Sequence, residues 1–73
     1  DKYVMIRMFR NSALGEYEFY LVSDNSELVK NAVIKIPSLQ KELISNEEGI
    51  AKIQIEYLPD NIELFVEARL IKL

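Results

Sequence analysis

The fold of this chain is decided by residues 50–66, which read IAKIQIEYLPDNIELFV. Apolar residues alternate with charged or polar ones on both sides of a central LPDN. A period of two places apolar side chains on one face of a β-strand, and proline followed by Asp and Asn is typical of a turn. The stretch therefore predicts two strands, at 50–56 and 62–71, joined by a turn at 58–61.

Further strands follow from the same alternation and from clusters of turn formers between them. We expect strands at 2–10, 16–22 and 31–36, and Pro37 ends the last of these because proline lacks the amide hydrogen that a sheet requires. Short strands connected by turns predict an all-β fold. We expect a small immunoglobulin-like or transthyretin-like β-sandwich of six to seven strands, with residues 1–73 forming one domain.

Residues 38–44 are compatible with more than one structure. Ser38 can cap a short helix here, and the same residues also suit a loop followed by a strand at 41–45. We favour the strand, because the turn formers at 46–49 then close a hairpin onto the next strand.

The alternation also assigns a core face to each strand, and a slip of one residue would exchange the two faces. The segment 2–10 is apolar on both faces, so its register stays open. The residues predicted to face inward are Tyr17, Phe19, Leu21, Ala32, Ile34, Ile36, Ala51, Ile53, Ile55, Ile62, Leu64, Val66, Ala68 and Leu70.

The composition argues against several kinds of chemistry. The 73 residues include no Cys, His or Trp, which removes disulfides, cysteine-ligated metals and histidine catalysis. The formal net charge of −3 argues against nucleic acid as a partner, since phosphates require a basic surface. No apolar run approaches the ~20 residues of a membrane span. Stability must therefore come from the apolar core, which 49% hydrophobic residues can supply.

Three segments, taken in order, are typical of one family. Residues 31–36 read NAVIKI, residues 44–53 read ISNEEGIAKI and residues 58–66 read LPDNIELFV. Together they resemble the carboxypeptidase regulatory-like domain, a transthyretin-like and immunoglobulin-like β-sandwich. Asn61 stands where that family commonly has glycine, and asparagine tolerates the left-handed backbone of such a turn.

The resemblance implies a non-catalytic accessory domain without a cofactor, of a kind often found in secreted or cell-envelope proteins. The chain begins without Met and ends inside an alternating apolar segment, so we expect a module of a longer protein. We expect a structural or protein-interaction role at the cell surface or in the envelope, and a cytoplasmic location stays open. The expected partners are neighbouring domains of the parent protein or another protein, with no nucleic acid, no membrane insertion and no small-molecule ligand.

The leading candidate for a binding surface is an apolar patch on the faces that the alternation turns outward. Contiguous apolar surface of this kind marks an interface. A second core layer, or packing against a further strand, explains the same residues equally well. The predicted patch comprises Met5, Phe9, Tyr20, Val22, Phe65 and Ile71.

The alternative function is ligand binding through the loops, with calcium or a carbohydrate as the ligand. The loops at 23–27 and 46–49 are expected at the same end of the sandwich, where their oxygen atoms would gather. The regular spacing of a calcium-binding loop is absent, so we predict no metal site. The weak candidates for metal ligands are Asp24, Glu27, Glu47 and Glu48. The tyrosines on which a sugar could stack are Tyr3, Tyr17, Tyr20 and Tyr57.

An enzyme is not expected. Glu16 and Glu18 share one strand face, as do Glu63 and Glu67, and paired carboxylates hydrolyse glycosides when a pocket holds them at the right distance. Charged residues at such positions are more typical of a solvated outer face that discourages pairing with other sheets.

Overall fold

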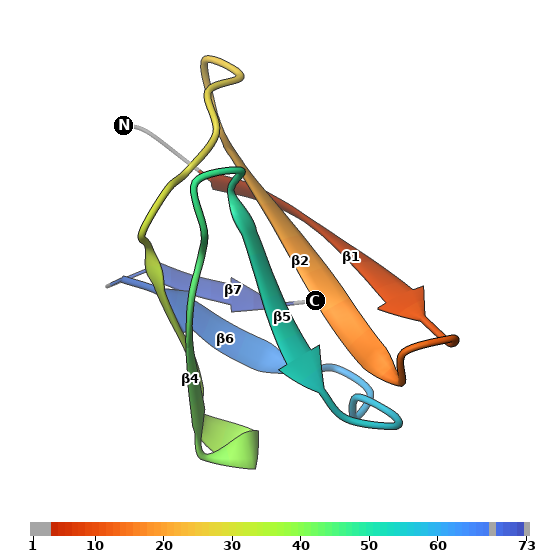
Figure 1. The fold of residues 1–73 in the computed structure, drawn as a ribbon. Helices are drawn as coiled ribbons and strands as arrows, with labels where there is room; N and C mark the ends of the chain where they lie inside the picture. The colour runs from red at the N-terminus through yellow and green to blue at the C-terminus, as the bar shows by residue number, and fades with distance from the viewer. Residues whose placement is uncertain (1–3, 68, 73) are drawn as a thin grey trace.

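The computed structural model describes residues 4–67 and 69–72, which form two antiparallel sheets (Figure 1). One sheet has three strands in the order β1-β2-β5, and the other has four in the order β4-β3-β6-β7. The strands are β1 (Val4–Asn11), β2 (Glu16–Ser23), β3 (Val33–Ile36), β4 (Lys41–Ile44), β5 (Ile50–Gln54), β6 (Glu63–Val66) and β7 (Arg69–Lys72), with a 3-10 helix η1 (Pro37–Leu39) between β3 and β4. The prediction of an all-β sandwich is confirmed.

The core is built by alternate residues of the strands. Along β2, for example, Tyr17, Phe19 and Leu21 are buried while the residues between them are not. Burying an aromatic or branched aliphatic side chain contributes about 1.5–3 kcal/mol, so these positions provide much of the stability. The buried apolar residues are Tyr17, Phe19, Leu21, Ala32, Ile34, Ile36, Ala51, Ile53, Ile62, Leu64 and Val66, as the alternation predicts.

The pairing of β1 with β2 settles the register that the sequence left open. The two strands pair without interruption from Val4 opposite Ser23 to Asn11 opposite Glu16. Ile6, opposite the buried Leu21, packs against the core. Met5 and the other odd-numbered residues of β1 therefore belong to the outer face of the sheet.

The segment that was compatible with more than one structure contains both a helical turn and a strand. After η1, Gln40 adopts a left-handed conformation with φ 53°, and β4 then pairs with β3, with Ile44 opposite Val33. The predicted strand is confirmed, and the helix is a single 3-10 turn.

The predicted hairpin at 46–49 is wrong, although the turn itself is present. The Gly49 N–H donates to the Asn46 carbonyl oxygen at 3.0 Å. However, β4 belongs to the four-stranded sheet and β5 to the three-stranded one. The physical reason is that Ser45 is tied to the β2–β3 connection: its N–H donates to the Ala32 carbonyl at 3.0 Å and its own carbonyl accepts the Asn31 N–H at 2.9 Å. The chain therefore crosses from one sheet to the other through this turn.

The predicted single strand at 62–71 is also wrong, because it is a hairpin of β6 and β7. Glu67 adopts a left-handed conformation with φ 58°, which reverses the chain, and its N–H donates to the Val33 carbonyl at 2.7 Å. The reversal exchanges the faces beyond it: Leu70, predicted inward, is 49% exposed, and Ile71, predicted outward, packs against the core. Ala68, also predicted inward, lies outside the described residues.

Two features of the described residues complete the fold. Asn61 has φ 54° in the turn before β6, the left-handed conformation expected there. Within residues 4–67 and 69–72, no helix has the length and apolar character needed to cross a membrane.

Candidate functional site

The outer face of the three-stranded sheet is formed by the side chains that alternate with the core residues of β1, β2 and β5. The strand register sets which of them are neighbours across the sheet. The rows are Met5 with Val22; Arg7 with Tyr20 and Ile50; Phe9 with Glu18 and Lys52; and Asn11 with Glu16 and Gln54. One end of the face is therefore apolar, and the other end is polar.

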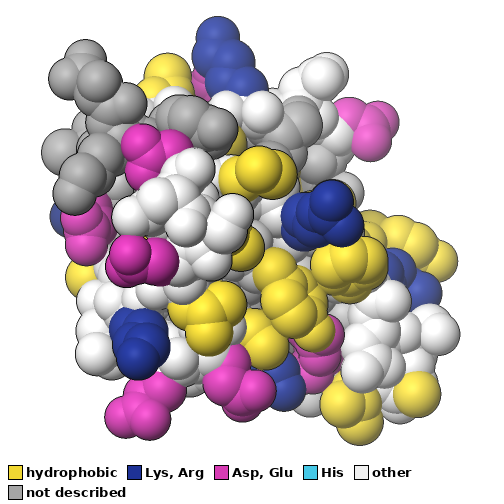
Figure 2. Space-filling view, turned by 90° about the horizontal axis from the view of Figure 1, so that it is seen from above, with side chains coloured by type: hydrophobic (Ala, Val, Ile, Leu, Met, Phe, Trp, Pro, Cys, Tyr) yellow, Lys and Arg dark blue, Asp and Glu magenta, His cyan; other side chains and the backbone are white. Residues whose placement is uncertain are grey.

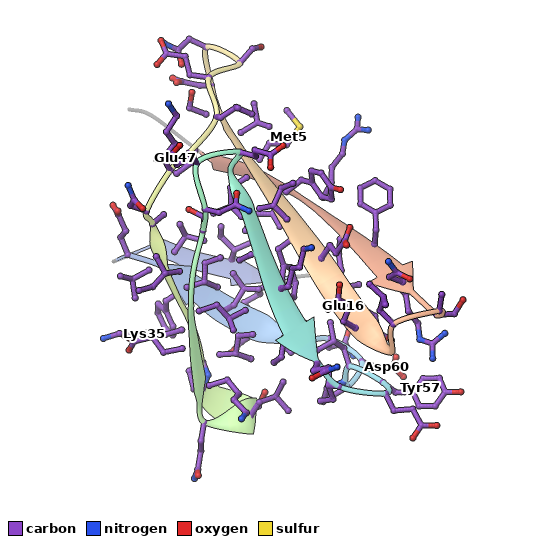
Figure 3. The ribbon with its side chains drawn as sticks, viewed as in Figure 1. Met5, Glu16, Lys35, Glu47, Tyr57 and Asp60 are labelled. Carbon is purple, nitrogen blue, oxygen red and sulfur yellow. The ribbon has the colours of Figure 1, made fainter. Side chains whose placement is uncertain are left out.

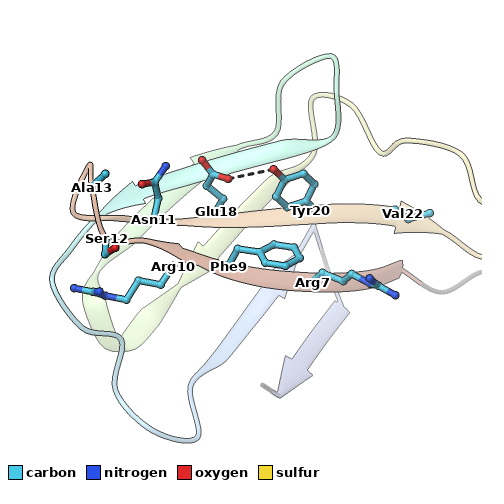
Figure 4. Close-up of a pocket in the computed structure, with 9 residues that line it drawn as sticks. All are labelled: Arg7, Phe9, Arg10, Asn11, Ser12, Ala13, Glu18, Tyr20 and Val22. Atoms are coloured by element: carbon cyan, nitrogen blue, oxygen red, sulfur yellow. Dashed lines mark hydrogen bonds between the residues drawn. The ribbon is translucent and has the colours of Figure 1, made fainter.

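A groove of about 710 Å³ lies on this face over β1 and β2 (Figure 4). Phe9, Tyr20 and Val22 form its apolar part. The rings of Phe9 and Tyr20 pack edge to face, with their centroids 5.2 Å apart and an interplanar angle of 85°. Since Phe9 is still 49% exposed, the groove presents an aromatic surface that is held in place and remains accessible.

The apolar surface continues beyond the groove towards the end of the sandwich that carries the β4–β5 turn. Met5 is 49% exposed there, and Figure 3 shows it at the same end as Glu47. Figure 2 shows hydrophobic side chains next to Lys or Arg on the side of the molecule where β1 lies in Figure 1.

The polar groups that β2 contributes to the groove are Glu18 and the Tyr20 hydroxyl, and they bond to each other. The Tyr20 hydroxyl donates to Glu18 Oε1 at 3.1 Å. This hydrogen bond, together with the negative charge of Glu18, raises the pKa of Tyr20 above its ordinary value. Lys52, on β5, places its Nζ 3.9 Å from Glu18 Oε2 and 4.0 Å from Glu16 Oε1. Its positive charge partly neutralises the negative charges of both carboxylates.

The β1 side of the groove is positively charged. Arg10 lies on the rim, where its Nε donates to the Glu56 carbonyl oxygen at 3.2 Å and its guanidinium lies 5.1 Å from the Tyr57 ring centroid. Arg7 lines the groove between Met5 and Phe9 and forms no ion pair with the carboxylates of the described residues. The groove therefore has the aromatic rings of Phe9 and Tyr20 at its base and the positive charges of Arg7 and Arg10 along one edge.

The structure divides the predicted patch between two places. Four of its residues lie together on this outer face: Met5, Phe9, Tyr20 and Val22. Phe65 lies on β6 in the other sheet, beside a smaller hollow of about 200 Å³. Ile71 packs against the core from β7. The sequence reasoning did not include Arg7, although the same alternation places it between Met5 and Phe9.

The loop residues considered for calcium lie at one end of the sandwich, as expected, but on separate loops. Asp24 and Glu27 follow β2, and Glu47 and Glu48 occupy the β4–β5 turn (Figure 1). Glu27 Oε1 accepts a hydrogen bond from Asn25 Nδ2 at 2.9 Å. Among residues 4–67 and 69–72, no three acidic side chains come close enough together to hold a metal ion.

The remaining candidates are also placed by the structure. Lys52 lies between Glu16 and Glu18, and Lys72 Nζ lies 3.6 Å from Glu63 Oε2, so these carboxylates lie near cations. Tyr17 is buried in the core, and Tyr57 stacks under Arg10, whereas Tyr3 lies outside the described residues. Of the three described tyrosines considered for sugar binding, Tyr20 is therefore the one that lines the groove.

Comparison of the chain with protein-family models, with curated proteins and with solved structures found no match.

Proposed function

We propose that this domain is a non-catalytic protein-interaction module that binds another polypeptide through the outer face of β1 and β2. The observation that carries this proposal is the edge-to-face pair of Phe9 and Tyr20, which remains accessible in a groove of about 710 Å³. Interfaces between proteins concentrate aromatic residues, Met and Arg at their centres and place polar groups around them. Met5 and Arg7 add the other two residue types to this face.

Binding suits the face better than catalysis does, because Glu18, the carboxylate that lines the groove, already accepts a hydrogen bond, whereas Glu16 Oε1 is buried without a hydrogen-bond partner among the described residues and lies outside the groove lining. Glu18 accepts the Tyr20 hydroxyl, and Lys52 lies within 4.0 Å of both Glu18 and Glu16. A general acid or base requires a pKa tuned to its task and a free path to a substrate. Paired carboxylates on an open sheet face provide a polar rim instead.

The strand order supports an immunoglobulin-like module as part of the proposal. An immunoglobulin constant domain arranges its seven strands as 1-2-5-4 and 3-6-7. Here the orders are β1-β2-β5 and β4-β3-β6-β7, so the two arrangements share the neighbours 2 and 5, and 3 and 6. They differ in the sheet that the fourth strand joins. Together with its sequence resemblance, this order leads us to propose an accessory module akin to carboxypeptidase regulatory-like domains, located in a secreted or cell-envelope protein.

Site-specific photo-crosslinking in the cells that make the protein tests the binding face. Phe9 is replaced by benzoylphenylalanine in one variant, and Ile44 is replaced in a matched control. Ile44 is a suitable control because it is 62% exposed but lies on β4 of the other sheet. We expect a defined protein adduct from position 9 and no such adduct from position 44.

The crosslinked protein is then purified, and its affinity for the domain is measured. Phe9→Ser is expected to weaken binding at least tenfold, and Ile44→Ser is expected to leave it unchanged. Circular dichroism and thermal melting verify that both variants fold, since neither side chain is in the core. The proposal fails if position 9 gives no adduct, if both positions give the same adducts, or if the two serine variants bind alike.

A further inference from the structure

The edge of β1 is long and regular. Its eight residues contain no proline or glycine, and they pair with β2 without a bulge. In the order β1-β2-β5, β1 is an outer strand, and no described segment lies beyond it (Figure 1). The other outer strand of this sheet, β5, has five residues. The edge strands of the other sheet, β4 and β7, have four residues each. A regular outer strand presents unpaired N–H and C=O groups, to which an extended segment of another chain can pair.

The charge of β1 is opposite to that of the whole chain. The strand carries Arg7 and Arg10 and no carboxylate, whereas the formal net charge of the protein is −3. Glu18 is the carboxylate of the groove, and it faces Tyr20 and Lys52 on the side away from the β1 edge. An incoming strand would therefore meet positive charge along β1.

Building on the function proposed above, we propose that the partner presents an extended acidic segment that adds to the edge of β1 as a further strand of the three-stranded sheet. Every second residue of a strand points to the same face of the sheet, and residues of neighbouring strands that lie opposite each other share that face. The segment would therefore place a carboxylate beside Arg7 and apolar side chains beside Met5 and Phe9. The six residues from Met5 to Arg10 would pair over about 20 Å. The segment would also close one side of the groove over the Phe9 and Tyr20 rings.

A second copy of this chain fits the same edge poorly. Pairing β1 of one molecule with β1 of another would bring four arginines, two from each strand, and no carboxylate to one junction. Like charges on neighbouring strands destabilise a sheet. Arg7 and Arg10 therefore disfavour self-association and favour a segment of opposite charge.

Synthetic peptides provide the test. The first peptide has blocked ends and the sequence Glu-Phe-Val-Glu-Val-Val. When it runs antiparallel to β1, its two glutamates lie opposite Arg10 and Arg7, and its Phe lies opposite Phe9. The second peptide has lysine in place of both glutamates. Two further versions of the acidic peptide carry N-methyl groups on either the odd or the even backbone amides.

Binding is followed by titrating the isotope-labelled domain and recording its amide resonances by NMR. We expect the acidic peptide to shift the β1 amides and to bind at least tenfold more tightly than the lysine peptide. Arg7→Glu should reverse that preference, whereas Lys41→Glu on β4 should not. A strand uses only one of its two edges to pair, so one N-methylated peptide should bind like the parent and the other should not bind.

Several results would overturn the inference. It fails if neither charged peptide shifts β1 at millimolar concentration, if the lysine peptide binds as well as the acidic one, or if both N-methylated peptides bind equally. It also fails if the domain dimerises through β1 and the dimer excludes the acidic peptide. The proposed function is judged separately, because crosslinking at position 9 reports a protein partner on this face whether or not that partner pairs with β1.

Discussion

The Ser45 hydroxyl donates a hydrogen bond to the Val29 carbonyl oxygen at 2.7 Å, across 16 positions of the chain. The same hydroxyl oxygen accepts the Ala32 N–H at 2.9 Å, and Ser45 is only 1% exposed. One side chain thus satisfies two backbone groups of the β2–β3 connection. It fixes that connection to the end of β4, where the chain leaves the four-stranded sheet.

Ser45→Ala is expected to destabilise the domain by about 2–4 kcal/mol, because it leaves the buried Ala32 N–H and the partly buried Val29 carbonyl without this partner. Chemical denaturation monitored by circular dichroism measures the free energy of unfolding. Ser38→Ala is the control, since Ser38 is exposed and should change stability by less than about 0.5 kcal/mol. Equal costs for the two substitutions would show that the Ser45 hydrogen bonds contribute nothing.

Gly49→Ala is expected to cost more stability than Gly15→Ala by about 1–3 kcal/mol. Both glycines have positive φ, +74° and +64°, so an alanine is strained at either position. At Gly49, a Cβ would lie 2.9 Å from the Leu21 carbonyl oxygen and 3.2 Å from the Val29 nitrogen, whereas nothing lies within 4 Å at Gly15. Relief of that clash would displace the Gly49 carbonyl, which accepts the Leu21 N–H at 2.8 Å.

The two alanine variants are compared by their midpoints in denaturant. Because Gly15→Ala isolates the cost of the backbone conformation, the difference between the variants measures the clash at Gly49. Variants with the same midpoint would mean that the β4–β5 turn shifts freely, and the close packing of Gly49 against β2 would then have no energetic weight.

Glu67→Asn is expected to stabilise the domain by about 0.5–1 kcal/mol, since asparagine adopts the left-handed conformation at lower cost than other non-glycine residues. Glu67 has φ 58° and is exposed, so its side chain is not needed for packing. Thermal melting measures the effect. Glu47→Asn, at an exposed turn position whose φ is not positive, should give no such gain. A loss of stability on Glu67→Asn would contradict the assignment of strain to this turn.

Glu18→Gln is expected to lower the pKa of Tyr20, because the hydrogen bond to Glu18 and its negative charge are the main causes that raise it. Ultraviolet absorbance at high pH follows tyrosine ionisation, and Tyr20→Phe identifies which part of the titration belongs to Tyr20. Since the pKa is raised in the folded state, the hydrogen bond stabilises the fold at pH values below the pKa of an unfolded tyrosine. That stability is lost as the pH rises through the folded pKa. An unchanged titration in Glu18→Gln would exclude the Glu18 interaction as the cause.

The alternation of the strands predicted most of the core, because period-two burial depends only on local geometry. It failed at Glu67, where a residue other than glycine or asparagine adopts a left-handed conformation and no sequence signal marks the reversal. It also could not distinguish a hairpin from a crossing at 46–49, since the turn chemistry is the same in both. That choice is made by the hydrogen bonds of Ser45 to Val29 and Ala32, which are distant in the sequence.

The candidate site was predictable in part for a related reason. Alternation assigns residues to the outer face of a strand, and it correctly separated Tyr20 and Val22 from the core, whereas Met5 and Phe9 lie in a strand whose two faces are both apolar and were placed by its pairing with β2. It does not say which sheet a strand joins, so Phe65 was grouped with them although it lies on β6 in the other sheet. That Met5, Phe9, Tyr20 and Val22 form one surface follows from the register in which β1 pairs with β2, and this register could not be read from the sequence.

The pairing of β2 with β5 and of β3 with β6 has a consequence for synthesis on the ribosome. Neither sheet is encoded by a continuous piece of chain, so the three-stranded sheet cannot be completed before β5 has emerged, nor the four-stranded sheet before β7 has emerged. Strands that are distant in the sequence can pair only after the loops between them have closed, and closing these loops costs conformational entropy before any contact is gained. The nascent domain would therefore remain unfolded until nearly all of these 73 residues are outside the exit tunnel, and then fold in a single cooperative step.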